Sequence, residues 1–219
     1  GINQSQIQEE IGYTFASGLR SILRQDPDII MVGEIRDSDT ANLATHASLT
    51  GHLVFSTLQT NDSIGVIPRL IDLGVEKYLI APTLNLAMAQ RLLRRLCPSC
   101  KIKTKPEIAE EKIIREAIDA MPEEVKKDLP KTFDIYKAND AGCGECKGKA
   151  YKGRVAIFEV FEINDGVEKV ILSGISESAL GEEAKRQGML SMFQDGILKV
   201  LEGTVSLEEL LEVAEVGNA

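Results

Sequence analysis

The chain has 219 residues, of which 43% are hydrophobic and 27% are charged, and its formal net charge is −9. This composition is typical of a globular protein with one large domain or two smaller ones. No apolar run approaches the ~18 residues that a membrane span needs. The acidic balance argues against nucleic acid as the main partner, because a phosphate-binding surface needs a basic excess.

The first predicted helix, Thr14 to Gln25, has apolar residues at helical spacing and carries Arg20 and Arg24 four positions apart. Pro27 marks its end, because proline cannot continue a helix. The two arginines lie either on a solvated helix face or in contact with phosphate or a neighbouring subunit. The residues alone leave both possibilities open.

An apolar strand is predicted next, from Ile29 to Val32, and it stops at Gly33 and Glu34. Continuous apolar strands of this length are typical of parallel sheets that are covered by helices on both faces. In α/β proteins, ligands bind at the carboxyl ends of such strands. Glu34 is therefore predicted to meet a ligand or its metal. The alternative is a surface glutamate at the end of an ordinary core strand.

Helices and strands alternate in the following segment. We expect a helix at Thr40 to Leu49, a second apolar strand at His52 to Leu58, and a helix at Ser63 to Leu73. This alternation predicts an α/β fold with a parallel sheet. A further helix is predicted at Thr83 to Leu96, because large apolar residues recur at four-residue steps, at Leu84, Met88, Leu92 and Leu96.

The four cysteines form two Cys-x-x-Cys pairs, Cys97 with Cys100 and Cys143 with Cys146. Two such turns aim four thiolates at one ion and are typical of a closed, structural Zn²⁺ site. Disulfides would need an oxidising compartment, and a redox Cys-x-x-Cys would not need a partner pair. Five nearby cations are expected to offset the surplus negative charge of such a site: Arg94, Arg95, Lys101, Lys147 and Lys149.

The segment between the cysteine pairs contains a predicted helix at Glu107 to Ala120, which we interpret as an insertion and a contact surface for a partner. A strand is predicted at Val155 to Ile163, and three or four short acidic helices between Gly166 and Val216. We expect three domains: a sheet-containing domain at 1–96, a tetracysteine zinc subdomain at 97–146, and a strand with C-terminal helices at 147–219.

Several runs, in this order, resemble the secretion and pilus-assembly ATPases, the hexameric motors of bacterial type II secretion and type IV pilus assembly. They are Leu23 to Asp37, Ala47 to Asp62 and the tetracysteine unit. The resemblance covers nearly the whole chain and implies a RecA-like P-loop NTPase core, a partial parallel sheet with flanking helices, beside a zinc-binding subdomain and C-terminal helices. The tetracysteine unit favours the secretion and pilus-extension branches over the retraction branch.

The resemblance also implies roles for individual residues. Leu23 to Asp37 matches the Walker B region, where an acidic side chain helps to hold Mg²⁺ against the nucleotide phosphates, so this role falls on Glu34. His52 matches a family histidine expected near the γ-phosphate of ATP, although it lies at the start of its strand. Gln59 stands where relatives usually have a second histidine. Arg20 and Arg24 are further candidates for contacts with phosphate.

The expected assembly is a homo-hexamer that binds Mg-ATP between subunits. Its expected partners are an inner-membrane platform protein and recruiting proteins, which hold it at the cytoplasmic side of the inner membrane as a peripheral protein. The chain has no Gly-x-x-x-x-Gly-Lys-Ser/Thr loop. We therefore expect a C-terminal part of a longer protein, inactive by itself. The alternative function is a non-enzymatic, zinc-stapled module that docks a partner.

Overall fold

The computed structural model describes residues 2–214, which form two compact units. The first contains the residues up to Ala87 together with Phe161–Glu183, and the second contains Met88–Val160 together with the residues from Ala184 on. None of the helices in this part of the chain combines the length and apolar character that crossing a bilayer requires. The expected division into domains at 1–96, 97–146 and 147–219 stays a prediction.

The first unit contains a parallel pair of strands, β1 (Ile29–Ile35) and β2 (Leu53–Leu58), connected by helix α2 (Ser38–Leu49). Ile29 lies opposite Leu53 and Ile35 lies opposite Leu58, with an irregular register between Val32 and Ile35. The predicted strand, helix and strand are therefore confirmed. The first strand extends beyond its predicted stop at Gly33 and Glu34.

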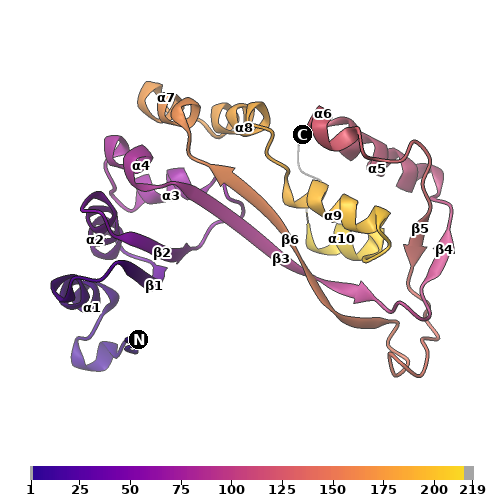
Figure 1. The fold of residues 1–219 in the computed structure, drawn as a ribbon, viewed down its shortest axis with the longest axis horizontal. Helices are drawn as coiled ribbons and strands as arrows, with labels where there is room; N and C mark the ends of the chain where they lie inside the picture. The colour runs from indigo at the N-terminus through magenta and orange to yellow at the C-terminus, as the bar shows by residue number, and fades with distance from the viewer. Residues whose placement is uncertain (1, 215–219) are drawn as a thin grey trace. The chain divides into compact units, whose positions relative to one another are not determined.

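Helices α1 (Phe15–Ile22) and α2 lie on one side of this sheet, as Figure 1 shows. Alternate strand residues point towards them, so that Ile30 and Val32 are buried against Leu19, Ala44 and Ala47. The residues on the opposite face are exposed by 47–74% of their surface: Ile29, Met31, Leu53 and Phe55. Within the described residues, helices thus cover one face of the sheet and not the expected two.

Shorter helices complete the first unit. They are the 3₁₀ helices η1 (Glu9–Ile11) and η2 (Leu23–Gln25), then α3 (Val66–Asp72), α4 (Lys77–Thr83) and α7 (Asp165–Ser173), followed by α8 (Glu177–Arg186), whose last residues belong to the second unit. Helix α4 packs against both α2 and α7. Helix α3 begins three residues later than predicted, which leaves Pro68 in its first turn, where proline is tolerated.

The predicted helix at Thr83 to Leu96 is wrong. Residues Leu86–Leu96 form strand β3, which pairs with β6 (Tyr151–Glu162), the strand that contains most of the predicted Val155 to Ile163. A spacing of four residues is also two full repeats of a strand, so the same leucines fit either structure. Pairing with β6, more than fifty residues along the chain, decides between them.

The second unit packs helices against short strands. Strands β4 (Ile102–Thr104) and β5 (Ile135–Lys137) pair in antiparallel fashion, and helices α5 (Ile108–Asp119) and α6 (Glu123–Lys126) lie between them in sequence. Helices α9 (Met192–Leu201) and α10 (Leu207–Val213) supply much of the buried core. The helix predicted at Glu107 to Ala120 and the short C-terminal helices are confirmed. Fully buried core residues include Leu93, Ile114, Ile157, Ile197 and Leu210.

Candidate functional site

The carboxyl end of β1 holds Glu34, whose side chain is 29% exposed. The Nε of Arg36 donates a hydrogen bond to the Oε2 of Glu34 at 2.6 Å. The Oγ1 of Thr57, near the carboxyl end of β2, donates to the carbonyl of Gly33 at 2.8 Å. Carboxylate and hydroxyl oxygens therefore meet at one edge of the sheet, and the Arg36 bond engages one of the two Glu34 oxygens.

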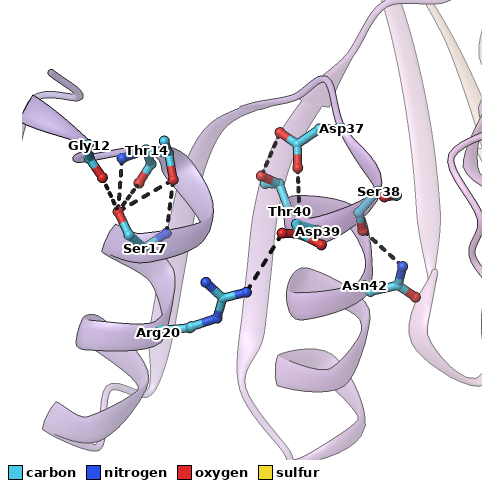
Figure 2. A network of polar contacts seen from close by, with 9 residues as sticks. All are labelled: Gly12, Thr14, Ser17, Arg20, Asp37, Ser38, Asp39, Thr40 and Asn42. Atoms are coloured by element: carbon cyan, nitrogen blue, oxygen red, sulfur yellow. Dashed lines mark hydrogen bonds and ion pairs between the residues drawn. The ribbon is translucent and has the colours of Figure 1, made fainter. Parts of the chain in front are cut away.

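Two helices begin at this edge, and their capping contacts are drawn in Figure 2. The side chain of Thr14 accepts the Ser17 N–H at 3.2 Å, and the Ser17 hydroxyl accepts the Thr14 N–H at 2.8 Å, which forms a reciprocal capping box. Asp37 caps α2 by accepting both the N–H and the hydroxyl of Thr40, at 2.8 and 2.9 Å.

The beginning of α1 lies close to the end of β1, because the Phe15 ring is 3.3 Å from the position that a Gly33 side chain would occupy. Helix α2 follows β1 directly in the chain. An open cavity of about 460 Å³ lies at these helix starts, lined by Thr14, Ala16, Asp37, Ser38 and Asp39. The edge thus combines carboxylates, hydroxyls and two helix N-termini.

The two predicted arginines lie in successive turns of one helical run, Arg20 at the end of α1 and Arg24 in η2. The Nη2 of Arg20 lies 3.8 Å from the Oδ2 of Asp39, at the start of α2 (Figure 2), and both side chains are more than half exposed. An exposed pair at this distance contributes little to stability, so little free energy is lost when Arg20 exchanges partners. Arg24 follows one turn later, five residues before β1, and so lies further from the start of α1 than Arg20.

His52 lies at the opposite edge of the sheet, directly before β2. Its Nδ1 is 3.0 Å from the Ala47 carbonyl oxygen and 3.2 Å from the Thr50 hydroxyl, which fixes the ring. The next residue, Leu53, donates its N–H to the carbonyl of Asp28. Glu34 lies six residue steps along the strand from Asp28, a distance on the order of 20 Å at ~3.3 Å per residue.

The register of β1 and β2 places Gln59, which directly follows β2, at the same edge as Glu34. Arg20, in the last turn of α1, meets this edge only through its long contact with Asp39. The edge does not bring His52 or Arg24 to Glu34. The sequence reasoning missed Arg36 and Thr57 as neighbours of Glu34. Arg36 directly follows β1 and carried a usable signal, because residues two apart in extended chain share a face. The roles assigned to these residues stay predictions.

The four cysteines of the second unit meet at one point. Their sulfurs all lie within 4.8 Å of one another, and the closest pairs are Cys97 to Cys143 at 3.7 Å, Cys143 to Cys146 at 3.8 Å and Cys100 to Cys146 at 3.9 Å. Four thiolates about 2.3 Å from a central Zn²⁺ would have edges of about 3.8 Å in a regular tetrahedron. All four cysteines are free. The donor set and its size therefore fit a tetrahedral metal ion.

Backbone bonds shape the two cysteine turns. The N–H of Cys97 donates to the Ala150 carbonyl at 2.9 Å, and the N–H of Cys143 donates to the sulfur of Cys146 at 3.1 Å. Burial opposes the Cys146 thiolate, but hydrogen bonds from the Cys143 backbone and from neighbouring groups outweigh it and lower the Cys146 pKa to about 6. Burial and the adjacent sulfurs raise the pKa of Cys100 to about 12. The surroundings of Cys146 thus favour its thiolate, and those of Cys100 favour its thiol.

The cations expected to offset the site's charge divide into two groups. Arg94 pairs with the buried carboxylate of Glu209, and the Nζ of Lys101 donates to the Gly203 carbonyl at 2.6 Å. The side chains of Arg95, Lys147 and Lys149 are exposed. The first group therefore connects the cysteine turns to the C-terminal helices, a function that the sequence did not reveal.

Comparison with known proteins gives consistent matches. The family described as "Type II/IV secretion system protein" matches residues 1–212. The chain is 48% identical over 211 residues to the type IV pilus assembly ATPase PilB of Myxococcus xanthus. The match covers 96% of this chain and 36% of that protein. It is also 44% identical over 213 residues to the type II secretion system protein E of Pseudomonas aeruginosa. That match covers 97% of this chain and 40% of the other protein.

The chain thus spans about a third to two fifths of the length of these relatives. A solved structure of the pilus retraction motor PilT with bound ADP has a similar fold, with a TM-score of 0.60 and 24% identity. That match covers 94% of this chain and 44% of the other. At this identity the likeness establishes the α/β fold alone.

Proposed function

Because the chain belongs to the type II/IV secretion system protein family, we propose that it is the C-terminal part of a hexameric motor ATPase. This motor would couple Mg-ATP hydrolysis to the assembly of pilin or pseudopilin subunits at the inner membrane. It would bind an inner-membrane platform protein and recruiting proteins from the cytoplasmic side. The relatives named as pilus assembly ATPase and secretion protein E support this proposal.

The observation that carries the proposal is the placement of Glu34 at the carboxyl edge of β1 and β2, where two helices also begin. Ligands of open α/β sheets bind at this edge. Mg²⁺ prefers oxygen ligands and keeps several of its waters. One Glu34 oxygen is held by Arg36, and the carboxylate is partly exposed, so it is suited to a water in the magnesium shell.

In this proposal each residue has a limited task. Bound Mg²⁺ would neutralise charge on the nucleotide phosphates. Glu34 would orient a magnesium-bound water, and Arg20, which makes a long contact with Asp39, could turn towards phosphate at the same edge. His52 lies at the other edge, and Arg24 lies one turn beyond Arg20, so both would act on nucleotide only if a different subunit presents it. In the proposed hexamer, nucleotide bound between two subunits would allow such a contact.

The tetracysteine centre would hold Zn²⁺ as a structural ion through Cys97, Cys100, Cys143 and Cys146. Four thiolates close the coordination shell and leave no position for substrate. The centre would fix the ends of β3 and β6, because the first cysteine turn directly follows β3 and the second precedes β6.

The test is a titration of Mg-ATP against this 219-residue chain and against a longer protein that joins it to an upstream phosphate-binding loop. We expect binding and hydrolysis by the longer protein and neither by the shorter chain, because the shorter one lacks the phosphate loop. Absence of nucleotide binding by both would contradict the motor proposal. The zinc-stapled docking module would then be the better account.

A further inference from the structure

The first cysteine turn is held from both sides by one loop of the C-terminal region. On its near side, the N–H of Leu96 donates to the Thr204 carbonyl at 2.9 Å. On its far side, the Nζ of Lys101 donates to the Gly203 carbonyl at 2.6 Å. These are the residues that immediately precede Cys97 and follow Cys100, and they bond to consecutive carbonyls. The loop is therefore fitted to this turn.

The loop itself is closely packed. Gly203 adopts a left-handed conformation with φ of 69°, which glycine tolerates best. The ring of Tyr136 occupies the space where a side chain on Gly203 would lie. The ammonium group of Lys101 lies 4.2 Å from the centre of the same ring. A cation, an aromatic ring and a carbonyl thus pack together beside the cysteines.

A second contact joins the strand before this turn to α10. The side chain of Glu209 is 4% exposed and accepts both the backbone N–H of Arg94 at 2.8 Å and its Nε at 2.7 Å. The Arg94 guanidinium also lies 4.2 Å from the ring centre of Tyr151, the first residue of β6. Hydrogen bonds that pair a buried carboxylate with arginine in this way are strong and directional.

We propose that the Gly203–Thr204 loop and Glu209 form a latch that positions the first cysteine turn for metal binding, with Lys101 and Arg94 as its positioning residues. The latch couples the metal centre to helices α9 and α10. Groups that orient metal ligands typically change metal affinity by about 10- to 100-fold when they are removed. Coupling is reciprocal, so metal binding in turn holds α10 in place. This inference rests on the proposed metal centre.

The test measures Zn²⁺ affinity of the 219-residue chain by competition with a chelator of known affinity. We expect Lys101→Met and Glu209→Gln each to bind Zn²⁺ about tenfold more weakly than the unaltered chain. Lys149→Met is the matched control, because it removes an exposed ammonium group that also lies close to a cysteine in sequence. If positioning of the ligands, and not charge alone, is the cause, this control should bind Zn²⁺ within about twofold of the unaltered chain.

A second measurement needs no substitution and so does not depend on folding of a variant. Addition of Zn²⁺ to the unaltered chain should slow amide hydrogen exchange in Leu207–Val213, and should leave exchange in Ser38–Leu49 of the first unit unchanged. No Zn²⁺ binding by the unaltered chain would overturn the metal centre itself. The latch alone would be overturned by a different result. In that case the unaltered chain binds Zn²⁺ tightly, both latch variants bind it equally tightly, and Zn²⁺ does not change hydrogen exchange in α10.

Discussion

Gly142 has no room for a side chain. It adopts φ of +60°, and a Cβ at this position would lie 2.5 Å from the backbone of Gly148. A residue with a side chain loses about 1–2 kcal/mol in the left-handed conformation even without such an overlap. Gly142→Ala should therefore distort the second cysteine turn and weaken Co²⁺ binding at least about tenfold. The absorption bands of thiolate-bound Co²⁺ report this directly.

Gly144 provides the control within the same turn. It lies between Cys143 and Cys146, its φ is outside the left-handed region, and a Cβ there would have no neighbour within 4 Å. Gly144→Ala should bind Co²⁺ like the unaltered chain. Equal binding by both alanine variants would show that the turn adapts to a side chain at either position.

Glu34 is the residue on which the proposed hydrolysis depends most. In the longer motor protein, Glu34→Gln should leave ATP binding nearly intact and abolish turnover, because the amide keeps the shape but loses the charge that orients a magnesium-bound water. Equilibrium nucleotide binding and phosphate release measure the two effects separately. Asp28→Asn, directly before the other end of β1, should change neither quantity. Normal turnover by the Glu34 variant would contradict the magnesium role.

Among the elements, α2 offers a clean comparison at its first turn. Asp37 caps the helix through two short bonds to Thr40, whereas Asp39 makes a 3.8 Å contact with the exposed Arg20. Asp37→Ala should lower the free energy of unfolding by about 1 kcal/mol. Asp39→Ala should change it by less than about 0.5 kcal/mol. Urea unfolding of both variants measures the difference, and equal losses would contradict the assigned cap.

The strength of local signals explains which elements the sequence predicted. Helix α1 has Thr14 before its first turn and apolar residues at helical spacing, and β1 is a short apolar run after a proline. Both signals are contained in the segment itself. Strand β3 is different, because its leucines fit two periodicities and its hydrogen-bond partners come from β6. A single segment does not contain the information that decides such a case.

The candidate sites follow the same rule. The four cysteines were predicted to converge because the spacing within each pair limits the geometry, and the structure brings their sulfurs together. Glu34 was placed correctly at a strand end, and the position of His52 at a strand start was also evident. Their separation along parallel strands follows from the register. The contact between Arg94 and Glu209 joins residues 115 positions apart, and no local pattern indicates it.

For the whole molecule, the uncovered face of β1 and β2 has consequences in solution. Met31 and Phe55 are 74% and 54% exposed, and apolar surface of this kind promotes association. Met31→Lys and Phe55→Lys should lower the fluorescence of a bound hydrophobic dye and reduce self-association in sedimentation. Each should change the free energy of unfolding by less than about 1 kcal/mol, since neither side chain is buried.

The neighbouring position tests the assignment of faces. Val54 packs against the core under α1 and α2, and successive strand residues point to opposite faces. Val54→Lys should therefore unfold the first unit, whereas Phe55→Lys leaves it folded. Unchanged dye binding by the Met31 and Phe55 variants would indicate that another surface binds the dye.

The distance between the two cysteine turns along the chain also sets an order of events during synthesis. Cys100 and Cys146 are 46 residues apart, so at about 5–20 residues per second the ribosome delivers the second turn roughly 2–9 s after the first. During that interval a metal ion can find only two of its four sulfurs. Closure of the proposed metal site would therefore wait for the intervening helical segment, and Cys146, the last of the four cysteines to be made, would decide when all four sulfurs can hold the ion.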